Sequence, residues 1–189
     1  MPQYLAWPVR TRADFADIRR RYDPDSPGRL PAGWDQLVEW APERQIPLWA
    51  PGIGSIGFYS MLRRWMGTET ACTVFYDDPT LAEEMLDFVA DFAVAVFTRA
   101  FAEVTPDYFL WWEDFSFKNG PLVSPPIFRQ FLQPHSRRVN DLLSRLGIDI
   151  IFLDTDGDPT VLLGPLLESG VNGTYPIEAA AGMDPVVLR

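Results

Sequence analysis

Cysteine and histidine are almost absent from this sequence. Cys72 is the only cysteine, so the chain cannot build an internal disulfide framework or a cysteine-based zinc site. We interpret Cys72 as a small buried hydrophobic residue, and its isolation favours a cytoplasmic setting. His135 is the only histidine, and it stands within a predicted helix just after Pro134. That position favours a structural or surface role over proton transfer.

Long apolar runs and excess positive charge are also lacking. No segment approaches the roughly 18 apolar residues of a membrane span, and the first residues lack the apolar core of a signal peptide. The chain has 16 Lys and Arg against 26 Asp and Glu, a net charge of −10. This balance argues against nucleic acid or anionic membranes as partners and favours a cationic or metal-bound ligand. We expect a soluble protein that is not exported and that binds a small molecule, with no resident cofactor.

The length and the order of patterns predict a single domain over residues 1–189. At 189 residues and 47% hydrophobic, the chain can bury one sizeable core. Residues 1–44 read as a helical segment, opened by an N-cap pattern at Thr11 and Asp14. A second short helix is expected from Trp34 up to Pro42. In residues 45–189 strands alternate with helices. The expected strands are 46–50, 108–112, 148–153 and 171–176, and the expected helices include 79–105, 125–146, 159–168 and a last one from 184.

This alternation is typical of an α/β fold with a parallel sheet. The sheet is either open or part of a (β/α)8 TIM barrel, with about four parallel strand/helix units. A complete barrel needs about 250 residues, so this chain can hold only a partial one.

The stretch 148–158 carries the strongest signal of a functional site. Its apolar run, 148–153, is typical of a parallel strand that is covered on both faces. Asp154 and Asp156 follow the run directly. Ligands of parallel sheets gather beyond the carboxyl ends of the strands, so these two acids are good site candidates.

Carboxylates follow three of the expected strands in the same way. Because the carboxyl ends of parallel strands share one edge, we predict that five acids cluster there as catalytic candidates: Glu113, Asp114, Asp154, Asp156 and Glu178. Three interpretations stay open. The acids could cap the following helices, transfer protons or bind substrate after raising one another's pKa, or hold a hard cation. A calcium loop is excluded, because the glycine falls one place early and Pro165 stands where the bidentate Glu belongs.

The same end of the sheet supplies candidates for substrate binding. The glycines of the loop 51–55 allow close approach of the backbone to a ligand or to the next helix, although their spacing does not match a dinucleotide fingerprint. The residues that we predict to contact substrate are Gly54, Tyr59, Trp112, Lys118 and Tyr175.

Several stretches together resemble the uroporphyrinogen decarboxylase family, which also holds the corrinoid and coenzyme M methyltransferases. They are RWMGTETACTVFYDDPTLAEEML, WWEDFSFKNGPLVSPPIFRQFLQPHSRRV and GIDIIFLDTDGDPTVLLGPLLESGVNGTYPIEAAAGMDPVVLR. The resemblance runs from about residue 45 to the end. It implies a (β/α)8 barrel with its pocket at the carboxyl ends of the strands, of which this chain spans the middle units and is truncated at both ends.

Departures from the family pattern bear on the activity. The family's arginine-bearing first strand and the aspartate of the next would precede the first residue. Its catalytic tyrosine aligns with Arg63, while Tyr59 is near but unmatched. The methyltransferases bind zinc through His-x-Cys where this chain has Asp154 and Asp156, so we do not expect thiol activation by zinc. A polycarboxylate porphyrinogen would also be repelled by the acids.

The resemblance therefore favours a decarboxylase-type lyase, or a diverged relative acting on another small-molecule carboxylate. One alternative is a corrinoid-type methyltransferase relative without the usual zinc ligands. Another is an inactive partial barrel that binds a ligand or a subunit. A half barrel leaves edge strands and apolar surface uncovered, so we expect a homodimer or pairing with another chain.

Overall fold

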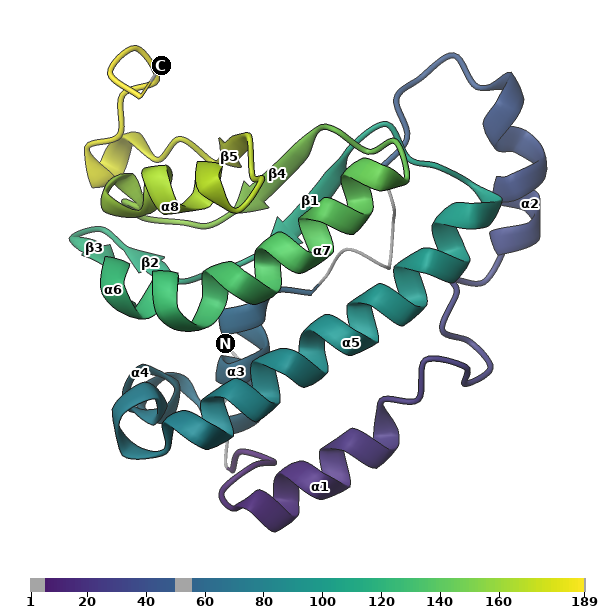
Figure 1. Ribbon diagram of the computed structural model, residues 1–189. Helices are drawn as coiled ribbons and strands as arrows, with labels where there is room; N and C mark the ends of the chain where they lie inside the picture. Colours follow the sequence, from purple (N-terminus) through teal and green to yellow (C-terminus); the bar gives the residue numbers. More distant parts are fainter. Residues whose placement is uncertain (1–5, 50–55, 189) are drawn as a thin grey trace.

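The computed structural model describes residues 6–49 and 56–188, which form an α/β fold with a small parallel sheet lying against a layer of helices (Figure 1). The parallel strands are β1 (Phe109–Trp112), β4 (Ile151–Asp154) and β5 (Gly173–Tyr175), and a hairpin is formed by β2 (Ser116–Phe117) and β3 (Gly120–Pro121). The helices are α1 (Arg12–Arg21), α2 (Trp34–Trp40), α3 (Phe58–Met66), α4 (Thr68–Asp77), α5 (Pro79–Glu103), α6 (Pro125–Ile127), α7 (Gln133–Arg145) and α8 (Leu163–Glu168).

The strands lie side by side in the order in which the chain visits them. The sheet order is β1-β4-β5, and both pairings are parallel. On the free side of β1, Trp49 forms a parallel bridge with Tyr108. The predicted strand 46–50 is therefore represented by this bridge rather than by a regular strand, and Ala50 lies outside the described residues. The parallel α/β arrangement expected from the sequence is confirmed.

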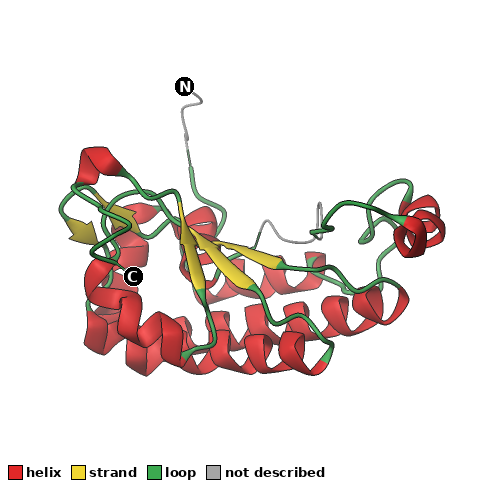
Figure 2. Cartoon of the chain, turned by 90° about the horizontal axis from the view of Figure 1, so that it is seen from above, coloured by secondary structure: helices red, strands yellow, loops and turns green. Residues whose placement is uncertain are grey.

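Among the residues that the structure describes, helices cover only one face of this sheet. Figure 2 shows the helical layer on one side of the strands. Along β4, Ile151 and Leu153 point into that layer and are buried, whereas Phe152 and Asp154 alternate with them and are half-buried. The prediction that this strand is covered on both faces is wrong. A continuous apolar run looks the same in either case, because it does not show whether a second layer is present.

The longest helix, α5, forms the centre of the helical layer. It begins at Pro79, and the Asp78 side chain accepts a hydrogen bond from the Leu81 N–H. Its apolar face is buried against the rest of the core, with Met85 and Phe97 almost fully enclosed. His135 on α7 is buried and lies with its Nε2 3.1 Å from Oε1 of Glu83 on α5. Its place between two helices fits the structural role expected for it.

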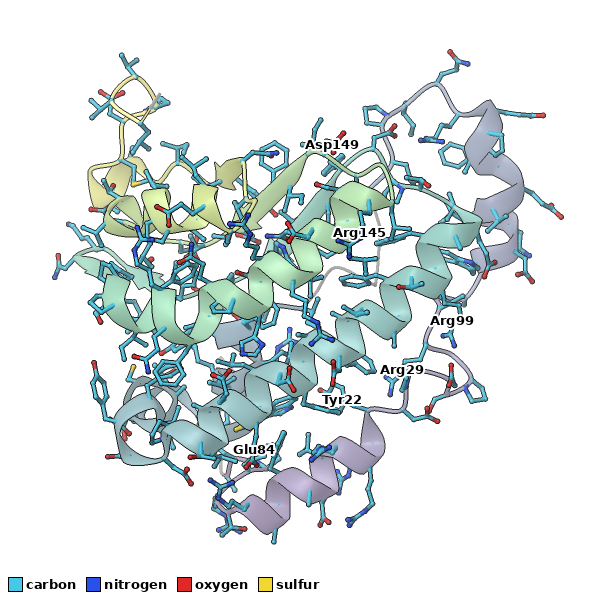
Figure 3. All side chains as sticks on the ribbon, viewed as in Figure 1. Tyr22, Arg29, Glu84, Arg99, Arg145 and Asp149 are labelled. Atoms are coloured by element: carbon cyan, nitrogen blue, oxygen red, sulfur yellow. The ribbon has the colours of Figure 1, made fainter. Side chains whose placement is uncertain are left out.

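The helix α1 packs against α5, on the side of α5 that faces away from the sheet. Its predicted cap is confirmed, since Thr11 and Asp14 form a reciprocal capping box. Arg12 of α1 makes an ion pair with Glu84 at 2.8 Å. Figure 3 labels Tyr22, whose ring lies 5.8 Å below the Arg29 guanidinium, at the junction of α1 with α5. The amino-terminal segment thus belongs to the same core as the sheet.

Three local features differ from the sequence prediction. The loop around Lys118 is the turn of the β2–β3 hairpin. The expected helix 125–146 contains a π-helical turn at 128–132 immediately before α7. Pro134 follows that turn. In a regular α-helix a proline has no N–H to donate and its ring clashes with a preceding carbonyl, and the wider π-helical turn accommodates the ring. Residues 184–188 form turns instead of the expected helix.

Within the described residues, no helix has the length and apolar character needed to cross a membrane.

Candidate functional site

Three side chains form a row across the carboxyl end of the sheet, on the face that the helices leave open. The strand register places Trp112 beside Asp154 and Asp154 beside Tyr175. Side chains in register on parallel strands point to the same side, so all three belong to the open face. The Tyr175 hydroxyl donates a hydrogen bond of 3.2 Å to Oδ2 of Asp154. This row is the centre of the candidate site.

The surroundings of Asp154 suit it for proton transfer. Partial burial raises the pKa of Asp154, the hydrogen bond from Tyr175 lowers it, and the nearby carboxylates of Asp156 and Asp114 raise it again. The net pKa lies above the usual aspartate value. Burial and the Asp154 charge together raise the pKa of Tyr175 to about 12, so its hydroxyl keeps its proton at neutral pH. Asp154 thus holds a proton at a higher pH than an exposed aspartate does.

Two arginines of α3 border this row. The Arg64 guanidinium lies 4.4 Å from the ring centroid of Trp112. Arg63 makes an ion pair of 2.7 Å with Oδ2 of Asp114. Arg64 was not among the predicted site residues. The pattern of α3 alone does not show that the last turn of this helix reaches the end of β1. Positive charge therefore lies at the rim of the acidic cluster.

Glu113 has a different role from its neighbour Asp114. It is buried, and its carboxylate accepts hydrogen bonds from the backbone N–H groups of Phe58 (2.6 Å), Tyr59 (3.1 Å) and Ser60 (2.9 Å). Burial raises the pKa of Glu113 to about 7, against the opposing effect of these three donors. Glu113 therefore caps the amino end of α3, a helix that precedes it in the chain, whereas the capping expected from the sequence concerned the helices that follow the strands.

A glycine makes this cap possible. Any side chain on Gly57 would collide with the Trp112 carbonyl and would meet Oε2 of Glu113 at 2.7 Å. The start of α3 can approach the end of β1 this closely only because position 57 has no Cβ.

The other acids are dispersed around the row. Asp156 is exposed and acts on Asp154 through its charge. Glu178 accepts a hydrogen bond of 2.6 Å from the Gly157 N–H, and so joins the segment after β5 to the loop after β4. The structure therefore brings Asp114, Asp154 and Asp156 together and turns Glu113 and Glu178 toward the backbone.

The predicted substrate-binding residues are divided in the same way. Trp112 and Tyr175 lie on the open face. Lys118 is exposed in the β2–β3 turn. Tyr59 is fully buried with its hydroxyl 3.1 Å from the Cys72 sulfur, so it does not reach the open face. Gly54 lies outside the described residues.

A second row of open-face side chains lies one step back along the strands. Leu110, Phe152 and Gly173 are in register there, and the Phe152 ring occupies the space that a side chain on Gly173 would need. Leu110 and Phe152 of this row border a cavity of about 440 Å³ together with Trp49, Tyr108 and Tyr175. Tyr108 and Phe152 were not among the predicted site residues, although each lies on the open side of its strand in the alternating pattern.

Metal binding receives no support from the side-chain positions. Within 6–49 and 56–188, no three His, Cys, Asp or Glu side chains are placed so that they could hold a metal ion.

Comparisons with protein families, with curated proteins and with solved structures find no match to this chain.

Proposed function

We propose that this chain is a partial barrel of the uroporphyrinogen decarboxylase type. The support comes from the sheet, in which parallel strands lie in chain order and helices cover one face only. A barrel has this arrangement, because each strand is hydrogen-bonded to the next one in the chain and the helices lie outside. The open face then corresponds to the barrel interior, and the row Trp112–Asp154–Tyr175 to the active end of that interior.

The proposed activity is proton transfer by Asp154 to a small-molecule carboxylate during decarboxylation. The observation that carries this proposal is the half-buried Asp154, hydrogen-bonded to Tyr175 at the carboxyl end of the open face. Burial shifts the pKa of Asp154 upward, in the direction that favours the protonated form of a general acid. The guanidinium of Arg64 lies against the Trp112 ring at the same rim.

The step balances in the following way. The carbon–carbon bond to the substrate carboxylate breaks, and carbon dioxide leaves without the bonding electron pair. The carbon that keeps the pair takes the proton of Asp154. Water then returns a proton to the Asp154 carboxylate. Tyr175 contributes by holding the carboxyl group in place through its hydroxyl.

Release of carbon dioxide from carboxylated pyrroles, uroporphyrinogen and pyrrole-2-acetate among them, tests the proposal. We expect Asp154→Asn to lower the rate by about 100-fold or more, because general acid catalysis contributes on that order. Asp158→Asn is the matched control, since Asp158 caps the turn at Thr160 and does not belong to the row. Equal rates for the wild type and Asp154→Asn would contradict the proposed role.

A second candidate function, completion of the barrel by another chain, is favoured by the outer side of β5. Within the described residues β5 pairs only with β4. Beside its free edge is a largely apolar cavity of about 320 Å³, bordered by residues that include Leu163, Leu167, Ile177 and Leu188. Leu167 is 64% exposed. A strand and helix from a second chain would cover this edge and leave the open face as an interior.

Sedimentation velocity tests this second candidate. We expect association at high micromolar concentration that Leu167→Glu weakens, because a charge would then be buried at the edge. A monomer at all concentrations would contradict pairing with a second copy.

A further inference from the structure

The aromatic side chains of the open face form a structure that proton transfer does not explain. We call it the aromatic box and define it by the residues that border the 440 Å³ cavity: Trp49, Tyr108, Leu110, Phe152 and Tyr175. Four of the five are aromatic. Trp49 is 38% exposed and Tyr175 is 40% exposed, so these rings form part of the accessible surface of an otherwise well-buried core. Such exposed aromatic surface is characteristic of binding sites.

The sheet holds the box in a fixed shape. Trp49 and Tyr108 lie side by side as partners in a parallel β-bridge, and Leu110 pairs with Phe152 in the β1–β4 register. The rings of Tyr108 and Phe152 meet edge to face, with centroids 6.1 Å apart. Tyr175 is fixed by its hydrogen bond to Asp154. A ligand would therefore find the rings already in place and would pay little to order them.

Charges of both signs lie near the box, since Arg64 lies over Trp112 in the neighbouring row and the carboxyl group of Asp154 is next to it. Asp154 lies beside the box, because its carboxyl group accepts a hydrogen bond from Tyr175. The one arginine of the adjoining hollow, Arg44, is engaged by Asp107 at 3.0 Å, so the two charges largely cancel. The chain as a whole carries a charge of −10. Aromatic ring faces are themselves electronegative and attract cations within about 6 Å.

We propose that the aromatic box binds an organic cation, a quaternary or methylated ammonium group. A methylated ammonium is weakly hydrated and has an apolar surface, so it gains from contact with aromatic rings while keeping its charge. The cavity volume lies in the usual range for small-molecule sites. A strongly hydrated inorganic cation would instead need several oxygen ligands, which Leu110 and the aromatic rings do not provide.

This inference goes beyond the proposed decarboxylation and can fail separately from it. Cation binding requires the rings of the box, whereas proton transfer requires the carboxyl group of Asp154. A chain that binds choline but releases no carbon dioxide from the carboxylated pyrroles would overturn the decarboxylation alone, and a chain that releases carbon dioxide without binding choline would overturn the cation site alone.

Calorimetry on the full chain with choline and tetramethylammonium tests the inference directly. The control ligand is 3,3-dimethyl-1-butanol, which has the shape of choline without its charge. We expect choline to bind about tenfold more tightly than the neutral alcohol, as measured cation–π interactions imply. Equal affinities would show a merely apolar pocket and overturn the proposal, and so would the absence of any binding heat.

Variants locate the binding. We expect Tyr108→Leu and Phe152→Leu each to weaken choline binding at least about fivefold, because each removes one ring from the box. Val161→Ala is the matched control, since Val161 is 60% exposed and does not border the cavity. Urea unfolding of each variant shows whether it folds. Folded variants that bind choline as the wild type does would overturn the proposal, as would a dimer whose formation closes the box against choline.

Discussion

The two faces of the parallel sheet carry different kinds of residues and have different roles. On the covered face, Trp111 is buried and donates a hydrogen bond of 2.8 Å from its indole nitrogen to Oδ1 of Asn140, which is buried as well. On the open face, Trp112 follows it directly and lies at the rim with Arg64 above its ring. Adjacent residues of one strand are thus assigned to the core or to the surface solely by the direction in which they point.

The acids at the strand ends repeat this contrast. Glu113 continues the covered side of β1 and is used by α3 as a cap, whereas Asp154 ends the open side of β4 and is reached by Tyr175. Burial raises the pKa of both carboxyl groups, but only Asp154 has accessible surface. A shifted pKa therefore identifies a candidate for chemistry only when the group can also meet a ligand.

The largest expected effect separates the two faces by stability. We predict that Leu153→Ala lowers the free energy of unfolding by about 3 kcal/mol, because it empties a closely packed position on the covered face. Phe152→Ala on the open face should cost about 1 kcal/mol, since its ring is only partly buried. Urea unfolding followed by circular dichroism measures both. Equal losses would mean that the two faces are not different.

A smaller difference is expected between the two acids. Glu113→Gln should lower the free energy of unfolding by about 2 kcal/mol, because the new NH2 group cannot accept from the backbone donors of α3. Asp154→Asn should change it by less than about 0.5 kcal/mol, as is usual for accessible positions. The same urea unfolding experiment measures both changes. A larger loss of stability for Asp154→Asn than for Glu113→Gln would contradict our assignment of the two roles.

The pH dependence of stability sharpens the account of Glu113. Its pKa rises from 4.5 to about 7 in the folded chain, so the folded state binds this proton more tightly than the unfolded state does. The contribution of protonated Glu113 to the free energy of unfolding is fully present below about pH 4.5 and is lost as the pH rises through 7. We predict that urea midpoints fall between pH 5 and 7.5 and that Glu113→Gln flattens this slope. A wild-type slope that is unchanged in the variant would contradict the assignment.

The smallest effect concerns Tyr175. Removing its hydroxyl in Tyr175→Phe takes away the bond that stabilises the ionised Asp154, so we predict that the pKa of Asp154 rises further. Carbon-13 NMR of the aspartate carboxyl groups during a pH titration measures this. A fall in the pKa of Asp154 would show that the hydroxyl does not act on the ionised form.

Local signals were sufficient to predict most helices. The cap at Thr11 and the long helix that begins at residue 79 depend on neighbours within a few residues, and the structure confirms both. The parallel pairing of the strands was also predictable, because strands that alternate with helices form parallel sheets.

The rest depends on contacts between distant parts of the chain. Glu113 becomes a cap because Gly57 lets α3 approach the end of β1, and the two positions are far apart in the sequence. The open face of β4 could not be foreseen either, since the apolar run at 148–153 is compatible with one covering layer or two. The aromatic box could not be predicted for the same reason, because it depends on Trp49 lying beside Tyr108.

The most direct test follows the indole N–H signals of the tryptophans by NMR while tetramethylammonium is added to the nitrogen-15-labelled chain. Trp49 belongs to the aromatic box and Trp111 to the covered face, and the variants Trp49→Phe and Trp111→Phe assign their signals. If the open face is the binding face, the Trp49 signal shifts with saturation and the Trp111 signal stays in place. A Trp49 signal that does not move, or a Trp111 signal that moves as far, would contradict the account.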